Sequence, residues 1–365
     1  MNLAERVAAV DACRWSTLSV PHAPYVTSLP WISHYGCQYV VHGDDITSDS
    51  NGEDCYRYVK AAGRFLVVKR TPGISTTDLV GRMLLCTKTH FIRSLHEYLV
   101  GYTDAGKTEE TKKQGHEMLQ RIKEYATDES GLKPGPEVWT WSGPQSLPGK
   151  PIASDEAGIF SLLVSGLGPK PGQKIVYVDG GFDLFTPGHV AFLRAVHAAE
   201  HNADTYVVAG VHDDHVINQW KGLNYPIMNI FERSLCVLQC RYINAVVLGA
   251  PFTPTKAYLE ALPLAMERPT SDGGISAVYH GPTAFIPLTY DPYVDAKEMG
   301  IYHETGKHDF ENINAGEIVG RIMAGRAAFE ERQRKKGIKA AGEEVTRRRE
   351  LLEQGAAEKE KARTV

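Results

Sequence analysis

Apolar runs alternate with amphipathic segments through the second half of the chain. The stretches KIVYVD, TYVVAGV and AVVLGA are continuously apolar or nearly so, which is typical of parallel strands buried on both faces. Between them, helical spacing of apolar positions predicts helices over about 188–201 and 230–241. Strands that alternate with helices indicate an α/β fold, a doubly wound parallel sheet of the Rossmann-like kind.

The first part of the chain repeats this pattern in the same order. ERVAAVDACRWSTLSVPHAPY at 5–25 matches ERSLCVLQCRYINAVVLGAPF at 232–252 with an offset of 227 (232 − 5). LVGRML at 79–84 matches IVGRIM at 318–323 with an offset of 239 (318 − 79). An ordered series of matches across both halves indicates two copies of one domain in tandem.

The two copies do not contain the same elements. The strand KIVYVDGGFDLF precedes Glu232 by more than fifty residues, whereas only four residues precede the matching Glu5. We therefore expect the first domain to be truncated at its N-terminus, without its opening strand and the corner after it. Such a domain exposes a sheet edge and part of its core, and we expect it to be stable only through packing against the second domain.

Composition shifts predict the domain boundaries. The chain divides into a truncated first domain at 1–127, a linker rich in proline and glycine at 128–173, a second domain at 174–330 and a charged, helical tail at 331–365.

Composition also narrows the class of protein. The 365 residues are 42% hydrophobic and carry a formal net charge of −4, which is ordinary for a globular protein and argues against nucleic-acid binding. The six cysteines are scattered without a paired metal-ligand pattern, so we expect no metal site in the protein itself. No apolar run is long enough to span a bilayer and no signal-peptide pattern stands at the N-terminus. We expect a cytoplasmic protein with no integral membrane association.

A corner between a strand and a helix is the first candidate site. In VDGGFDLFTPGHV the helix begins near Pro187, and the backbone N–H groups and dipole of a helix N-terminus favour an anion. Asp183 can fix the corner through backbone hydrogen bonds, Gly188 can let a phosphate approach, and His189 can donate to it. The alternative is that residues 180–189 form only a tight corner.

A run of donors in the first copy is the second candidate site. RTPGISTT at 70–77 supplies one guanidinium and several hydroxyls, from Arg70, Thr71, Ser75, Thr76 and Thr77. A structural helix cap is the alternative, but the density of donors favours phosphate binding. The second copy has DFENINAGE at 309–317 in this place, and acids there would repel a triphosphate.

These two stretches resemble the signatures of one enzyme family. GGFDLFTPGH is similar to the G-x-F-D-x-x-H-x-G-H signature of cytidylyltransferase-type nucleotidyltransferases, and RTPGISTT is similar to their second signature. Together with APYVTSL, VHGDDIT, KGLNYPIMN and HGPTAFIP, the tandem arrangement resembles the ethanolamine-phosphate cytidylyltransferase family. The resemblance covers residue 5 to about residue 330 and implies two cytidylyltransferase domains in one chain.

The resemblance implies a reaction and further site residues. CTP and phosphoethanolamine would give CDP-ethanolamine and pyrophosphate, with Mg²⁺ accompanying the nucleotide. The substrate phosphate attacks the α-phosphorus in line, so catalysis consists mainly of positioning and charge stabilisation. Lys221, Arg6 and Arg233 would lie near the nucleotide. The alternatives are a solvated lysine, and arginines that only supply charge and capping at helix N-termini.

The chain departs from the family pattern at Thr186, where the first signature has its first histidine. A hydroxyl donates one hydrogen bond but carries no charge, and losing a preorganised donor costs about 2.7–4 kcal/mol. Because neither copy holds both signatures, a non-catalytic nucleotide-binding or regulatory form is the second hypothesis. Phosphocholine or glycerol 3-phosphate is a third, against which the tandem repeat counts. A homodimer stays open.

Overall fold

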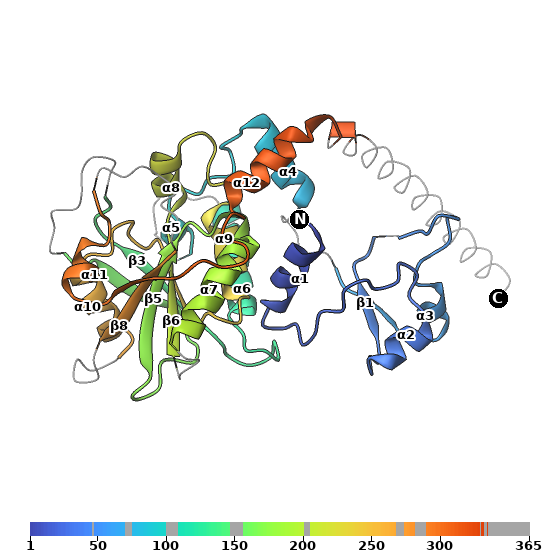
Figure 1. The fold of residues 1–365 in the computed structure, drawn as a ribbon, viewed down its shortest axis with the longest axis horizontal. Coiled ribbons are helices and arrows are strands. Elements are labelled where there is room, and N and C mark those ends of the chain that lie inside the picture. Colours follow the sequence, from blue (N-terminus) through green and yellow to red (C-terminus); the bar gives the residue numbers. More distant parts are fainter. Residues whose placement is uncertain are drawn as a thin grey trace.

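The fold is that of a computed structural model, in which one large sheet is flanked by helices (Figure 1). The structure describes residues 1–45, 47–69, 75–99, 109–146, 156–200, 205–267, 274–281, 290–328, 330, 331 and 334. We call residues 1–127 the first half and the residues from 128 onward the second half.

Seven strands form the large sheet, in the order β4-β3-β7-β6-β5-β8-β9. They are β3 (Glu137–Ser142), β4 (Ile159–Val164), β5 (Lys174–Gly180), β6 (Thr205–Val211), β7 (Ala245–Leu248), β8 (Ile275–His280) and β9 (Tyr302–Glu304). All neighbours pair in parallel except β3 and β4. Every residue of β6 and β7 is buried, because a parallel sheet is covered on both faces, and this confirms the α/β prediction.

The helices of the second half are η1 (Asp183–Phe185), α7 (Pro187–Ala199), α8 (Asp214–Lys221), α9 (Ile230–Leu238), α10 (Lys256–Ala265), α11 (Val294–Glu298) and α12 (Ala315–Ala324). The first half contains α1 (Leu3–Asp11), α2 (Leu29–His34), β1 (Val40–His42), α3 (Arg57–Ala61), β2 (Phe65–Val67), α4 (Thr76–Leu85), α5 (Leu95–Leu99) and α6 (Glu109–Tyr125). None of the helices in the described ranges has the length and apolar content that a membrane crossing needs.

The segment expected to be a linker contributes two strands to the sheet. β3 pairs in parallel with β7 over 137–140, and β4 pairs with β3 in the antiparallel direction. Trp139 and Trp141 on β3 are buried in the core that β7 and α10 also line. The proline and glycine around 128–173 suggested a connection, but the apolar stretches between them form strands.

The elements of the first half follow those of the second half in the order of the repeat. At offsets between 227 and 239, α1, α2, β1, α3, β2 and α4 match α9, α10, β8, α11, β9 and α12. β1 and β2 pair in parallel, as β8 and β9 do. Among the described residues of the first half, no element matches β5, α7, β6 or α8. In Figure 1, β1, α2 and α3 stand apart from the large sheet.

The two halves meet around a local two-fold axis. Cys13 and Cys240, which are equivalent at the offset of 227, face each other across an isolated antiparallel bridge. The backbone N–H groups of Arg14 and Arg241 donate across this bridge, each over 2.8 Å. α4 also packs against its equivalent, α12. A contact in which each residue meets its own equivalent is isologous, as in a symmetric dimer, but here it lies within one chain.

Two ion pairs follow the same symmetry. Glu5 on α1 pairs with Arg321 on α12 over 2.8 Å, and Glu232 on α9 pairs with Arg82 on α4 over 2.7 Å. Each glutamate also accepts the backbone N–H of the asparagine that caps its own helix. The N-terminus of one helix in each half is therefore held by the last matching helix of the other half.

The first half also contributes to one of the two cores of the sheet. Leu95 and Leu99 on α5, and Ile122 on α6, are buried together with apolar residues of α7 and α9. The core on the other face draws its buried residues from position 139 onward, as far as the structure describes the chain. Leu95, Leu99, Ile122 and Ala126 thus bury their side chains against the second half.

Candidate nucleotide site

A pocket of about 470 Å³ opens where β5, β6 and β8 end. Its lining includes Asp179 at the end of β5, His212 after β6 and His280 at the end of β8. The corner between β5 and α7 forms another wall, and the start of α12 closes the pocket beside it. Ligands of open α/β sheets bind outside the carboxyl ends of the strands, so this pocket is the candidate ligand site of the second half.

The corner after β5 is conformationally unusual. Phe182, Leu184 and Phe185 have φ of 48°, 59° and 36°, in the left-handed region that side chains rarely adopt. Asp183 holds the corner in this shape, because its two carboxylate oxygens accept the N–H groups of Ile227 and Met228 over 2.8 and 2.9 Å. Burial raises the pKa of Asp183, and these two hydrogen bonds oppose the shift. Its partners are backbone groups of a distant loop and not of the corner itself.

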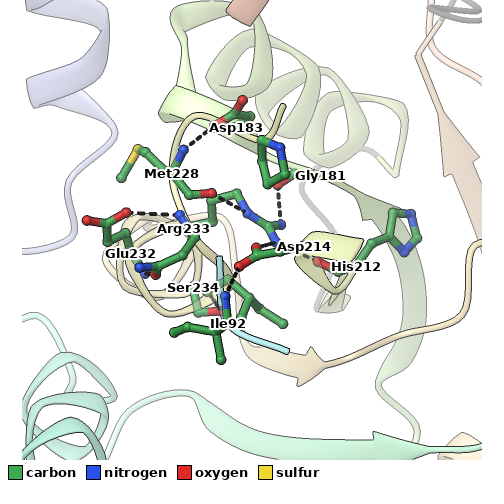
Figure 2. Close-up of polar contacts among 12 residues, drawn as sticks. Ile92, Gly181, Asp183, His212, Asp214, Met228, Glu232, Arg233 and Ser234 are labelled. Carbon is green, nitrogen blue, oxygen red and sulfur yellow. Dashed lines mark hydrogen bonds and ion pairs between the residues drawn. The ribbon is translucent and has the colours of Figure 1, made fainter. Parts of the chain in front are cut away.

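Arg233 is a buried arginine that joins several segments of the second half through hydrogen bonds (Figure 2). Its guanidinium donates to the carbonyls of Gly181 and His212, each over 2.6 Å, and to that of Met228 over 3.0 Å. It also pairs with Asp214 over 2.7 Å, and both side chains are 0% exposed. The structure therefore favours the structural alternative for this arginine: it ties the corner to the end of β6 and does not face the pocket.

The matching residue of the first half, Arg6, has a different setting. It is exposed on α1, and its guanidinium donates to the carbonyl of Met1 over 2.9 Å. It is not among the residues that line the pocket. The structure does not bring Arg6 and Arg233 together at a nucleotide.

The donors of the TPGH segment are bound to the protein itself. The hydroxyl of Thr186 donates to the carbonyl of Ile313 over 2.6 Å, and its backbone N–H donates to Nδ1 of His189 over 3.0 Å. A Cβ atom added at Gly188 would overlap the same Ile313 carbonyl oxygen. Because position 188 is a glycine, the 310–313 segment can lie against it. Carbonyl oxygens of that segment occupy the space beside Gly188 in which a phosphate was expected.

His189 is uncharged in this arrangement. Desolvation lowers its pKa to about 3, and the nearby ammonium of Lys221 contributes in the same direction. Its Nδ1 must act as an acceptor, because it receives the Thr186 N–H. The neutral ring therefore carries its proton on Nε2, where it can donate a hydrogen bond to a phosphate but contributes no positive charge.

Among the described residues of the predicted set, Lys221 is the cation that lines the pocket. Its ammonium lies 5.8 Å from the ring centroid of Tyr225, and burial lowers its pKa while the carboxylate of Asp183 opposes that shift. The family resemblance implied that this lysine lies near the nucleotide phosphates, and its position in the pocket wall is compatible with such a contact.

The sequence analysis did not predict three polar residues that line the pocket, Asp179, His212 and Tyr293. The hydroxyl of Tyr293 donates to Oδ1 of Asp179 over 2.6 Å, while Oδ2 has no hydrogen-bond partner within the described residues. Burial raises the pKa of Asp179 to about 7. Burial lowers the pKa of His212 to about 4, and its Nδ1 donates to the carbonyl of Ala250 over 3.0 Å. The position of Asp179 at the end of an apolar strand was the available signal.

The second signature lies elsewhere. Ser75 precedes α4 and its hydroxyl accepts the N–H of Asp78 over 3.5 Å, while Thr76 and Thr77 are exposed in the first turn. Arg70 and Thr71 lie outside the described residues. None of the three described hydroxyl residues lines the pocket, so the structure does not bring the two signatures together.

The repeat shows where the second signature lies within one domain. Asn314 and Ala315 are the equivalents of Ser75 and Thr76 at the offset of 239, and both line the pocket beside Thr186. In the second half, the start of α12 therefore lies beside the corner that follows β5. In the second half this position carries asparagine, alanine and glycine in place of three hydroxyls, so one side-chain amide replaces three hydroxyl donors.

The fold and the pocket define an α/β protein of the doubly wound class. A family model described as cytidylyltransferase-like matches residues 1–82 and 177–311. The chain is 37% identical over 343 residues to an ethanolamine-phosphate cytidylyltransferase of Dictyostelium discoideum, covering 93% of this chain and 82% of that protein. The mouse protein of the same name is 37% identical over 92% of this chain and 77% of its own length, and that of Arabidopsis thaliana is 31% identical over 92% and 71%. The chain belongs to the ethanolamine-phosphate cytidylyltransferase family.

Proposed function

We propose that the protein transfers the cytidylyl group of CTP to phosphoethanolamine, with pyrophosphate as the leaving group. The observation that carries this proposal is the position of Ser75, Thr76 and Thr77 at the N-terminus of α4. Asn314 and Ala315, the equivalents of Ser75 and Thr76 in the second half, line a pocket at the carboxyl end of the sheet. The relatives that are named for this activity support the choice of substrates.

The first half supplies the groups that stabilise phosphate charge. A phosphate oxygen of phosphoethanolamine attacks the α-phosphorus of CTP, and the bond to the β-phosphate breaks as pyrophosphate leaves. The hydroxyls of Ser75, Thr76 and Thr77 and the N–H groups of the first turn of α4 bind the negative charge that shifts to the leaving group. Arg70 and Thr71 belong to the same proposed set.

Mg²⁺ enters this proposal with the triphosphate. Within the described ranges no three His, Cys, Asp or Glu side chains gather in a way that could hold a metal ion. Mg²⁺ is commonly held by substrate phosphates with few protein ligands, so the nucleotide itself fits as its carrier. Bound there, the ion neutralises phosphate charge.

The second half has a positioning role in this proposal. The guanidinium of Arg82 donates to Glu232 and to the carbonyl of Ile227 over 3.0 Å, and Asn224 donates to the Arg82 carbonyl over 2.8 Å. These contacts fix α4 between the halves, two turns from the hydroxyls at its N-terminus. We further propose a cytoplasmic enzyme that acts on these small molecules and not on nucleic acid, consistent with the net charge of −4; a homodimer stays a prediction.

Pyrophosphate release by the full chain, supplied with CTP, phosphoethanolamine and Mg²⁺, tests the proposal. We expect release that requires both substrates and no release when phosphocholine replaces phosphoethanolamine. A chain that binds CTP in calorimetry but releases no pyrophosphate would be a non-catalytic nucleotide-binding form, and the proposal would be wrong. Release that is equally fast with phosphocholine would keep the reaction and overturn the substrate.

A further inference from the structure

Two cysteines face each other where the halves of the chain meet. Cys13 and Cys240 are opposite residues of an isolated antiparallel bridge. The two backbone hydrogen bonds of the bridge join the residues on either side of the cysteines. The cysteines themselves therefore form a non-hydrogen-bonded pair. Cα atoms in such a pair are about 4.5 Å apart and the side chains point to the same face. Disulfides span Cα separations of about 4.4–6.8 Å, so this pair falls within bonding range.

The surrounding contacts keep the two cysteines in register. The guanidinium of Arg14 donates to the carbonyl of Cys240 over 2.7 Å, and that of Arg241 donates to the carbonyl of Cys13 over 2.9 Å. The arginines also reach the carbonyls of Ile243 and Ser16 in the opposite half. The bridge is therefore fixed by backbone and side-chain bonds on both sides, which limits the motion that a new covalent bond would have to oppose.

The thiols of this pair are both free and differ in exposure. Cys13 is partly exposed, whereas Cys240 is 1% exposed. Burial raises the pKa of Cys240 to about 11, and the positive charges of Arg14 and Arg241 act in the opposite direction. An oxidant in solution therefore reaches Cys13 first, and Cys240 is the thiol placed to react with the product.

We propose that Cys13 and Cys240 are a modification site, a thiol pair that a peroxide converts into a disulfide between the two halves. With hydrogen peroxide, the Cys13 thiol loses its proton and its sulfur forms a bond to oxygen as the O–O bond breaks, which gives a sulfenic acid and hydroxide; the hydroxide takes up the proton and becomes water. The Cys240 sulfur then loses its proton and attacks the Cys13 sulfur, releasing water. In total two thiols lose two electrons, and peroxide is reduced to two water molecules.

Mapping the linked peptides tests this proposal on the reduced, full chain. The protein is treated with hydrogen peroxide, quenched with N-ethylmaleimide and digested with trypsin without reductant. We expect the peptide 7–14, which contains Cys13, to be joined to the peptide 234–241, which contains Cys236 and Cys240. Cys13→Ser and Cys240→Ser should lose the linked product, and Cys236→Ser should keep it.

A second readout does not depend on the variants. A nick by a protease anywhere between positions 14 and 239 should leave two pieces joined on a gel without reductant and separate with it. The oxidised chain should also unfold several degrees higher than the reduced chain, because the bond closes a long loop. The proposal is overturned if peroxide leaves both thiols open to alkylation, or carries Cys13 to the sulfinic acid, without a linked peptide.

Discussion

The two halves of the chain place matching residues in opposite surroundings. Val237 on α9 is 0% exposed, whereas its equivalent on α1, Val10, is 49% exposed. Tyr279 on β8 is 6% exposed, and the matching residue on β1, Val41, is 55% exposed. In the second half β5, β6 and α7 cover these positions, and no described element of the first half takes their place. An apolar pattern predicts which face of an element is buried only when the covering element is also present.

The same contrast applies to charged residues. Arg233 and Arg6 occupy equivalent positions after matching glutamates, but only Arg233 lies inside a shell of carbonyls and a carboxylate. In the corner of the second half, the Thr186 hydroxyl donates to a backbone carbonyl of the protein, while Thr76 and Thr77 at the start of α4 are exposed. Family motifs therefore identify equivalent positions, and the surroundings decide whether a position is structural or catalytic.

Replacing Arg233 and Arg6 in turn by alanine should give the largest difference in stability between matching positions of the two halves. Arg233→Ala should lower the free energy of unfolding by about 3–5 kcal/mol, because it leaves the buried Asp214 carboxylate without its partner. Arg6→Ala, its matched control, should change that free energy by at most about 0.5 kcal/mol. Urea denaturation measures both. Equal effects of the two variants would show that the buried cluster does not stabilise the second half.

Acid should destabilise the second half through His212. Its folded pKa of about 4 lies below the usual 6.5, so the folded protein binds fewer protons than the unfolded chain between these values. The stability that this histidine contributes is present above about pH 6.5 and is lost as the pH falls towards 4, by at most about 1.4 kcal/mol per pH unit.

Thermal unfolding of His212→Asn from pH 7.5 to 4.5 checks this expectation. The variant should lose less stability on acidification than the parent chain. His22→Asn, at an exposed position of the first half, is the control and should follow the parent. A His212 variant with an unaltered pH dependence would mean that the ring is not held neutral by burial.

A glycine substitution tests the closed corner of the second half. Gly188→Ala should lower the free energy of unfolding by about 1–3 kcal/mol, because its Cβ would overlap the Ile313 carbonyl. Gly320→Ala, in the middle of α12 with no atom within 4 Å of the new Cβ, should raise it by about 0.5–1 kcal/mol. If chemical denaturation finds Gly188→Ala as stable as the parent, the 310–313 segment does not lie against the corner.

The two symmetric ion pairs, Arg82–Glu232 and Arg321–Glu5, should differ in their contribution to stability by less than the substitutions above. The side chain of Arg82 is 10% exposed and that of Arg321 is 38% exposed, so solvent screens the second pair more. Arg82→Ala should cost about 2 kcal/mol of unfolding free energy and Arg321→Ala about 1 kcal/mol. Adding 1 M salt should reduce the Arg321 effect more than the Arg82 effect. The reverse order in urea denaturation would contradict the burial difference.

The sequence predicted the second half well because its strands are continuous apolar runs. β5, β6, β7, α7 and α9 lie where the pattern placed them, and the repeat matches the segments that form α1 and α4 to those that form α9 and α12. β3 and β4 were missed because proline and glycine surround them and because a strand's membership in a sheet depends on a partner far along the chain. Local spacing carries no information on that partner.

Long-range contacts also explain what the site predictions lacked. Asp183 was expected to bond near itself, but it accepts N–H groups from 227–228. The Glu232–Arg82 pair joins positions 150 residues apart. Neither contact has a sequence signal of its own. The repeat register could have suggested the second, since it aligns Glu5 with Glu232 and Arg82 with Arg321.

The most direct test compares one residue from each half in the same assay. Pyrophosphate release should be measured for Thr76→Val, which removes an exposed hydroxyl at the start of α4, and for His189→Asn, which keeps an acceptor for the Thr186 N–H. We expect Thr76→Val to lower kcat/KM by about tenfold or more and His189→Asn to change it by less than about twofold. Loss of turnover in His189→Asn with full activity in Thr76→Val would place the chemistry in the second half and contradict the account.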